Sequence, residues 1–157
     1  MIEYQLMRGQ QDLQEGDLPC INALIAALTK RNVRTSRDRL ITVMYRAQLI
    51  VARDISQESC SPIIGMATMN LVTTPYESYG SIDGVAVLPS HEGHGVGTTL
   101  VERLIEQGRN LGLSFVELTS GRGANRARAN HVYRDKLKGE LRDTNVYRWK
   151  FWADDER

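Results

Sequence analysis

The sequence predicts an α/β (α+β) fold in which a mixed, mostly antiparallel central sheet is flanked by about four helices. Three observations lead to this prediction. In the first half of the chain, strand patterns follow one another without an intervening helix, which favours antiparallel pairing. In the second half, strand and helix patterns alternate, as expected for crossover connections. The length of 157 residues predicts one domain, residues 1–157.

The first three elements are a strand and two helices. Residues 2–8 alternate between apolar and polar side chains and predict a short strand. Residues 18–32 carry apolar side chains on one helical face and predict a helix. Residues 35–47 predict a second short helix, for which Thr35 or Ser36 is the expected N-cap.

A run of three strands comes next. Residues 48–54 and 62–74 are strand-like on either side of a segment rich in turn-forming residues, so we expect a hairpin. Residues 80–89 predict a third, central strand that closes at Pro89.

The last elements alternate between helix and strand. A helix is expected from about Thr98 to Asn110, followed by a buried strand over residues 113–120. Residues 124–137 predict another helix, and residues 141–152 alternate as a last strand.

Composition narrows the function classes. The chain carries a formal net charge of +1, so attraction of the whole molecule to nucleic acid or membrane is not expected. The charges are uneven, because residues 121–150 hold nine Lys or Arg and three acids. This basic third faces an anionic ligand or forms a solvated surface. No apolar segment is long enough to span a membrane, and we expect a cytoplasmic protein.

A metal site is not expected. Cys20 and Cys60 are far apart and belong to no Cys-x-x-Cys motif. The three histidines, His91, His94 and His131, do not have the spacing of zinc ligands.

The stretch HEGHGVGTTL, residues 91–100, is the main candidate for a binding site. A Walker loop is excluded because no lysine lies nearby, and Leu100 stands where a dinucleotide fingerprint needs its third glycine. Glycines at 93, 95 and 97 before a helix let backbone N–H groups converge on an anion, and a pyrophosphate fits this best. The alternative is a plain tight turn between strand and helix.

Two motifs resemble the GNAT superfamily of acetyl-CoA-dependent N-acetyltransferases. GVAVLPSHEGHGVGTTLVERL is similar to the superfamily's cofactor core, Gln/Arg-x-x-Gly-x-Gly/Ala after a strand. RARANHVYRDKL is similar to its tyrosine helix, with Arg126, Ala129, Val132 and Tyr133 at the motif positions. The resemblance covers residues 80–151 and implies a GNAT-type fold, acetyl-CoA as cosubstrate, no metal, and an amine acceptor.

The resemblance also implies the site residues. The loop would bind the pyrophosphate, the strand at Val85–Val87 would pair with the pantetheine arm, and a strand N–H would polarise the thioester carbonyl. The positions expected to hold acetyl-CoA are Val85, Ala86, Val87, Glu92, Gly93, His94, Gly95, Val96, Gly97, Thr98 and Arg126.

Two side chains are the expected catalytic groups. Tyr133 would be the general acid that protonates the coenzyme A sulfur, although its spacing also suits the apolar face of a helix. Asp83 would be the general base, directly or through a water, although Asp-Gly is also a strong turn pair. Strand alternation predicts that Asp83 shares a face with Val85 and Val87, and Glu117 is a second candidate base.

One residue departs from the superfamily pattern. Glu92 stands where the signature has Gln or Arg, and an acid beside a pyrophosphate should repel it. Because backbone N–H groups carry most of the expected phosphate contact, we expect weaker binding of acetyl-CoA and not its loss.

The acceptor is expected to be a small-molecule or peptide amine. The basic segment TKRNVRTSRDR, residues 29–39, either lines the acceptor cleft and favours an amine that also bears an anionic group, or forms a solvated surface. A homodimer is left open. The rival functions are an acyl-CoA-binding module with little catalysis and, less favoured, a nucleic-acid-binding domain.

Overall fold

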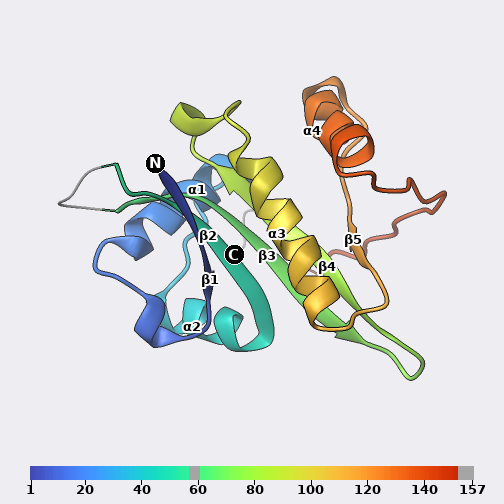
Figure 1. Ribbon diagram of the computed structural model, residues 1–157, viewed down its shortest axis with the longest axis horizontal. Coiled ribbons are helices and arrows are strands. Elements are labelled where there is room, and N and C mark those ends of the chain that lie inside the picture. The colour runs from blue at the N-terminus through green and yellow to red at the C-terminus, as the bar shows by residue number, and fades with distance from the viewer. Residues whose placement is uncertain (57–60, 152–157) are drawn as a thin grey trace. The chain divides into compact units, whose positions relative to one another are not determined.

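The computed structural model describes residues 1–56 and 61–151. The chain forms two compact units, Met1–Thr119 and Ser120–Arg157. The first unit contains a five-stranded sheet of order β1-β2-β3-β4-β5 (Figure 1). The strands are β1 (Ile2–Met7), β2 (Ala47–Asp54), β3 (Ile63–Thr73), β4 (Ser78–Val87) and β5 (Val116–Leu118). The first four pair antiparallel and β5 pairs parallel to β4, which confirms the predicted mixed sheet.

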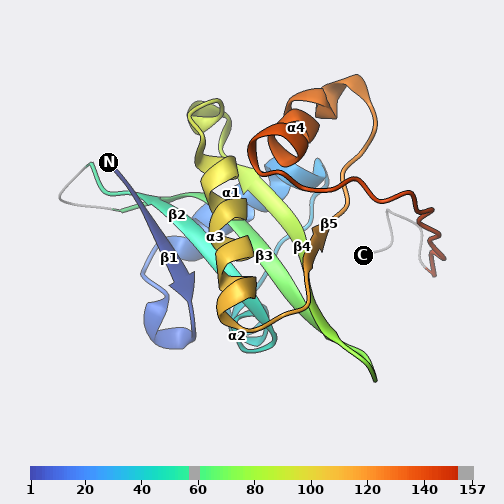
Figure 2. The ribbon, with the colours of Figure 1, turned by 45° about the vertical axis from the view of Figure 1, so that its right-hand side comes forward.

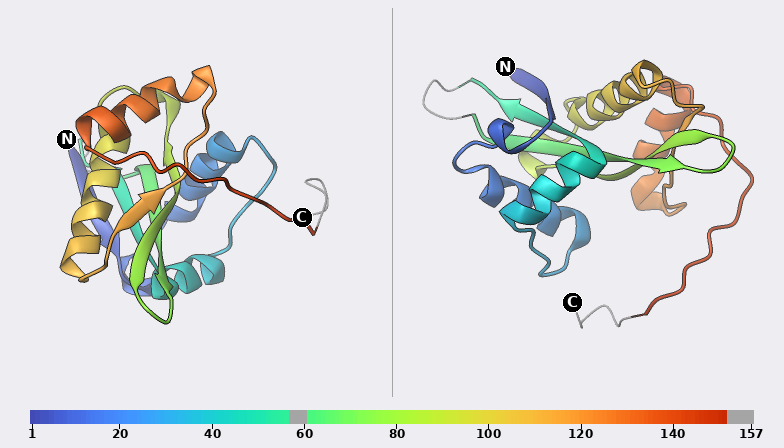
Figure 3. Two further views of the ribbon diagram at one scale, coloured as in Figure 1. Left: turned by 90° about the vertical axis from the view of Figure 1, so that its right-hand side faces the viewer. Right: turned by 90° about the horizontal axis from the view of Figure 1, so that it is seen from below.

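Helices cover both faces of this sheet. The α-helices are α1 (Asp17–Thr29), α2 (Arg37–Arg46), α3 (Val96–Asn110) and, in the second unit, α4 (Ala127–His131). Within the first unit, α3 lies on one face of the sheet, and α1 and α2 lie on the other (Figure 3). Shorter 3-10 turns occupy Gln10–Asp12, Pro89–His91 and Ala124–Arg126.

Local sequence explains where the helices begin and which sides they bury. The side chain of Ser36 accepts a hydrogen bond from the N–H of Arg39, so Ser36 is the N-cap of α2, one of the two residues proposed for it. The core contains the expected apolar face of α1, with Ile21 and Leu24 almost completely buried. On the opposite face of the sheet, α3 buries Leu100 and Leu104.

A buried ion pair ties α1 to the sheet. Two guanidinium nitrogens of Arg53 lie 2.7 and 2.8 Å from the two carboxylate oxygens of Asp17. Arg53 also donates to the side chain of Gln5, and Asp17 accepts from the N–H of Gln14. Both charges are therefore paired and hydrogen-bonded in an interior where an unpaired charge would cost several kcal/mol, on the order of 3–5.

The five strands predicted before residue 121 are present, and some of them differ in extent from the prediction. β2 and β3 form the predicted hairpin, but part of its turn, residues 57–60, lies outside the described residues. β3 and β4 form a second hairpin that reaches past the neighbouring strands (Figure 2). The buried strand predicted over residues 113–120 is wrong in length and burial, because β5 covers only Val116–Leu118 and is half-buried. It pairs with β4 over only three residues and lies at an edge of the sheet.

The last predicted strand is wrong. In the described part of the predicted segment, residues 141–151, the chain is neither helix nor strand. Alternation sets the two faces of a strand, but a strand also needs a hydrogen-bonded neighbour, and within the described residues no strand pairs with this segment. Their apolar side chains are exposed, with Trp149 at 75% and Phe151 at 85%.

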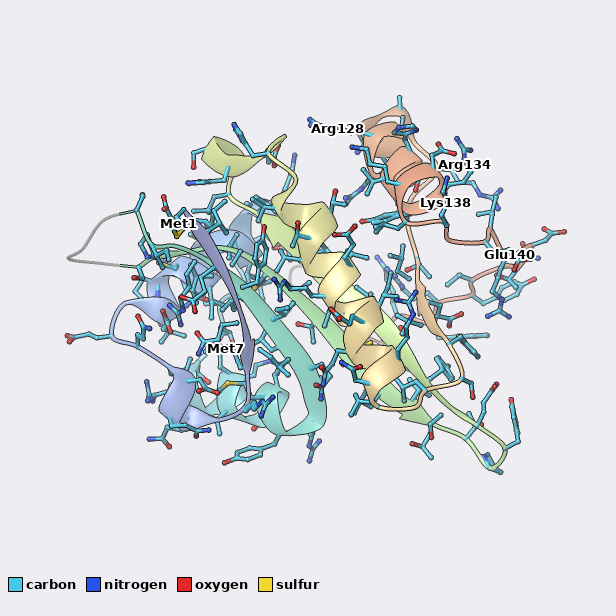
Figure 4. The ribbon with its side chains drawn as sticks, in the orientation of Figure 1. Met1, Met7, Arg128, Arg134, Lys138 and Glu140 are labelled. Atoms are coloured by element: carbon cyan, nitrogen blue, oxygen red, sulfur yellow. The ribbon has the colours of Figure 1, made fainter. Side chains whose placement is uncertain are left out.

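The second unit contains the predicted helix, in broken form. A 3-10 turn, α4 and a π-helical turn at Val132–Lys136 together cover residues 124–136. Figure 4 shows Arg128, Arg134 and Lys138 among the side chains of this unit, which accounts for part of the basic C-terminal third.

Candidate functional site

The glycine loop, residues 91–97, contains two positions whose backbone conformation favours glycine. Gly93 and Gly95 both have φ of +83°, in the left-handed region that side chains with a Cβ rarely adopt. Gly97 differs, because it lies in the first turn of α3 and a Cβ there would make ordinary contact with Val87, at 3.6 Å. α3 begins at Val96, two residues earlier than predicted.

The start of α3 offers backbone N–H groups to an anion. Its N-cap is Gly95, which has no side chain to cap the helix, and no side-chain cap hydrogen bond is formed there. The first N–H groups of a helix have no acceptor within the helix, and the helix dipole favours negative charge at this end. The side chains of Glu92 and His94 are exposed beside this helix start.

The entry to the loop is tied to the sheet through His91. Its Nδ1 lies 2.8 Å from the hydroxyl of Ser90, and its Nε2 lies 3.7 Å from a carboxylate oxygen of Asp54 at the end of β2. Hydrogen bonds from Ser56, with smaller contributions from the N-terminal ammonium and His91, lower the pKa of Asp54. Sequence reasoning missed this contact because it joins residues 37 positions apart along the chain.

β4 presents an open backbone edge next to the loop. Its parallel pairing with β5 covers only Gly80, Ser81 and Ile82. β4 then continues to Val87, and within the described residues no strand pairs with that part on the β5 side. Because Gly97 of α3 lies close to Val87, the end of this open edge is next to the start of α3. The structure thus brings together the loop and the strand segment Val85–Val87.

A β-bulge lies where the open edge begins. Thr68 of β3 pairs with Asp83 and Met66 pairs with Ala86, so Gly84 and Val85 together face the single residue Ala67. Gly84 has φ of +64°, which again favours glycine. The predicted alternation of Asp83, Val85 and Val87 on one face is therefore interrupted. The Asp-Gly pair, which is also typical of a turn, lies at this bulge in the structure.

The two candidate bases lie on neighbouring strands of the first unit. Asp83 is exposed, and its Oδ1 accepts a hydrogen bond of 2.8 Å from the N–H of Gly84, which holds the carboxylate over the bulge. Glu117 is half-buried at the middle of β5, where its backbone is in register with Ser81.

Tyr133 and Arg126 belong to the second unit. Tyr133 lies in the π-helical turn and is half-buried, and π-helical turns are frequent at functional sites. Burial raises the pKa of the Tyr133 phenol above 10.0, against a smaller lowering by the positive charge of Arg126. The phenol is therefore protonated at neutral pH. His131 is exposed, and its Nδ1 lies 2.6 Å from a carboxylate oxygen of Asp135.

Within residues 1–56 and 61–151, no group of three or more His, Cys, Asp or Glu side chains is arranged to hold a metal ion. In the same part of the chain, no helix has the length and apolar character needed to cross a membrane.

Comparison with known proteins gives one family match and many structural matches. Residues 24–137 match the model of the acetyltransferase (GNAT) family. No curated protein matches the sequence. An acetyltransferase from Trypanosoma brucei is 22% identical, with a TM-score of 0.72 over 96% of this chain and 100% of its own.

Two further structural relatives have more specific names. An aminoglycoside acetyltransferase from an uncultured soil metagenomic sample, solved with sisomicin, is 16% identical, with a TM-score of 0.74 over 97% of both chains. Glucosamine-6-phosphate N-acetyltransferase from Arabidopsis thaliana is 14% identical, with a TM-score of 0.69 over 95% of this chain and 98% of its own. At these identities the likeness establishes the fold.

Proposed function

The chain belongs to the acetyltransferase (GNAT) family, and from that premise we propose that it transfers an acetyl group from acetyl-CoA to a primary amine. The transfer is direct, in a ternary complex of protein, acetyl-CoA and acceptor, and residues 1–157 act as one domain. The observation that carries the proposal is the uncapped start of α3 beside the open edge of β4. This pair of features suits a ligand with a phosphate end and an extended amide arm.

The residues fit acetyl-CoA as a substrate. N–H groups of the segment Glu92–Thr98 bind its pyrophosphate, and the left-handed glycines let the backbone approach it closely. Val85, Ala86 and Val87 offer backbone groups to the pantetheine arm, as a sheet edge does to an added strand. Arg126 adds positive charge for the phosphates.

The chemistry needs one acid, one base and one hydrogen-bond donor. The amine nitrogen attacks the thioester carbonyl, the C–N bond forms and the C–S bond breaks. A backbone N–H of β4 stabilises the negative charge that develops on the carbonyl oxygen. Asp83, directly or through a water, takes the proton that the ammonium loses, and Tyr133 gives its phenol proton to the coenzyme A sulfur.

The names of two structural relatives support an amine acceptor. One is named for aminoglycosides and the other for glucosamine 6-phosphate. Both kinds of compound carry primary amines, and the acceptor proposed for this chain is a small molecule or peptide with such a group.

The proposal is tested by incubating the protein with acetyl-CoA and a pool of metabolites that contain amines. We expect N-acetylated product and free coenzyme A in proportion, both dependent on the amine. Acetyl-CoA binding without any transfer would instead support the second candidate, an acyl-CoA-binding module. The feature that favours this alternative is the exposed acid Glu92 beside the proposed pyrophosphate site at the start of α3.

Replacement of Glu92 tests whether its charge faces the phosphates. Glu92→Arg should lower the Kd for acetyl-CoA about tenfold, because it exchanges a repulsive charge for an attractive one, and tenfold corresponds to about 1.4 kcal/mol. Calorimetric titration at low salt measures the change. The control is Glu106→Arg, which makes the same charge change farther along α3. Equal effects of the two substitutions would mean that only the net charge matters.

A further inference from the structure

Backbone hydrogen bonds hold the entry of the glycine loop to the sheet. The N–H of Leu88 donates to the carbonyl of Ile64 in β3 at 2.8 Å, and the N–H of His91 donates to the carbonyl of Leu88 at 2.8 Å. The 3-10 turn Pro89–His91 therefore starts from a fixed point on β3.

The N–H groups proposed to bind the pyrophosphate belong to the segment after this turn. Among the described residues, none accepts a hydrogen bond from the backbone N–H groups of residues 93–98. Gly93 and Gly95 lie in this segment, and glycine has more backbone freedom than any other residue. The directions of these N–H groups therefore depend on how firmly the chain is held at α3 on one side and at His91 on the other.

His91 adds a side-chain contact to a further strand. Its Nε2 lies 3.7 Å from Oδ2 of Asp54, the last residue of β2, and its Nδ1 lies 2.8 Å from the hydroxyl of Ser90. Asp54 is itself held in place, because its N–H donates to the carbonyl of Pro62 at 3.0 Å and its Oδ1 accepts from the N–H of Ser56 at 3.0 Å. The loop entry is thus held by β3 through its backbone and by β2 through the His91 side chain.

The charge of this contact depends on pH. An unperturbed imidazole gains a positive charge as the pH falls through about 6.5. Hydrogen bonds from Ser56 lower the pKa of Asp54, which is therefore an anion throughout this range. Two further charges lie near the pair, the ammonium of Met1 at 3.8 Å from Oδ1 of Asp54, and the exposed Glu92 next to His91 in the chain. The attraction between the imidazole and the carboxylate is strongest at mildly acidic pH.

We infer that His91, through Asp54, is a positioning residue for the pyrophosphate of acetyl-CoA. The contact holds the loop entry against the end of β2, so that the N–H groups of residues 93–98 already have their binding directions when the ligand arrives. The inference rests on the proposed binding of acetyl-CoA, and no bond of the reaction forms at His91.

Asp54→Asn and His91→Gln test the contact as a pair. The side chains of His91 and Asp54 are 30% and 28% exposed, and such ion pairs are weak, so each substitution should raise the Kd for acetyl-CoA only about threefold near pH 6. The double variant should raise it no further, because either single change already removes the contact. Calorimetric titration of the four proteins measures this cycle. Multiplication of the two effects in the double variant, to about ninefold, would overturn the inference.

A ligand without phosphates distinguishes positioning of the pyrophosphate from general damage to the site. S-acetylpantetheine contains the thioester and the pantetheine arm of acetyl-CoA but none of its phosphates. Its Kd, followed through the NMR signals of the Val85 and Val87 amides, should be the same for His91→Gln and the unmodified protein. An equal loss of affinity for both ligands would place the effect outside the pyrophosphate site and would contradict the inference.

The pH dependence of binding separates this inference from the proposed function. The Kd for acetyl-CoA of His91→Gln, divided by that of the unmodified protein, should rise from about one near pH 8 to about three near pH 6. The ratio removes the titration of the ligand's own phosphates, which affects both proteins equally. His131→Gln is the matched control, because it removes another exposed histidine, which contacts Asp135, and its ratio should stay near one at both pH values.

A ratio that does not change with pH would overturn the role proposed for His91, even if acetyl-CoA is bound and its acetyl group is transferred. The expected ratio without any acetyl transfer would support this role and reject the proposed function. Failure of the unmodified protein to bind acetyl-CoA at either pH would reject both.

Discussion

Tyr133→Phe is expected to lower kcat about 100-fold, because general acid catalysis contributes roughly 10²–10⁴-fold and phenylalanine cannot donate a proton. The departing coenzyme A sulfur would have to take its proton from water. Removal of one hydroxyl group leaves the aromatic ring in place, so the Kd for acetyl-CoA should stay nearly constant. Steady-state kinetics and calorimetry measure the two quantities separately.

If Tyr133 is the general acid, kcat should depend on the protonated form of its phenol and therefore on pH. Burial raises the pKa of its phenol above 10.0, despite the opposing charge of Arg126. The acid form is therefore fully present at neutral pH and is lost only when the pH rises through this higher value. Tyr147→Phe is the matched control, since Tyr147 is 73% exposed in the same unit. An unchanged kcat in Tyr133→Phe with intact binding would rule out the acid role.

Gly95→Val is expected to raise the Kd for acetyl-CoA about 100-fold. Valine is strongly disfavoured at φ of +83°, so the N–H groups at the start of α3 would move away from their present directions. A hydrogen bond to a charged group contributes about 1.5–3 kcal/mol, and loss of one or two of them accounts for the change. Calorimetric titration with acetyl-CoA measures it.

Gly112→Val provides the matched control. Gly112 follows the other end of α3, has φ of +68° and, like Gly95, has open space around the position of a Cβ. Both variants should therefore lose similar stability through backbone strain, on the order of 1–2 kcal/mol. Only Gly95→Val should lose affinity for acetyl-CoA. Equal losses of affinity would trace the effect to general destabilisation.

Features that depend on neighbouring residues were predictable from the sequence. Ser36 caps α2 through a contact three residues away, and the glycines before α3 mark a helix start by themselves. The hairpin of β2 and β3 was predicted, and the succession of strand patterns without a helix between them favoured the antiparallel pairing of β3 with β4. The order of strands and helices therefore emerged correctly up to α4.

Features that depend on distant partners were not predictable. Arg53 and Asp17 are 36 positions apart, and neither local pattern indicates that they meet in the interior. The bulge at Gly84 looked like a turn, since Asp-Gly suits both and only the register with β3 distinguishes them. Residues 141–151 have the alternation of a strand, but a one-dimensional pattern carries no information about a pairing partner.

The central claim is that the backbone around the start of α3 and the open edge of β4 hold acetyl-CoA. The most direct measurement follows the backbone amide signals by NMR during a titration with acetyl-CoA. We predict saturable shifts of the Gly95, Gly97 and Thr98 amides together with those of Val85 and Val87, while the amide of Gly112 stays in place. Saturable binding that leaves the amides of residues 93–98 unmoved, or no binding, would contradict the claim.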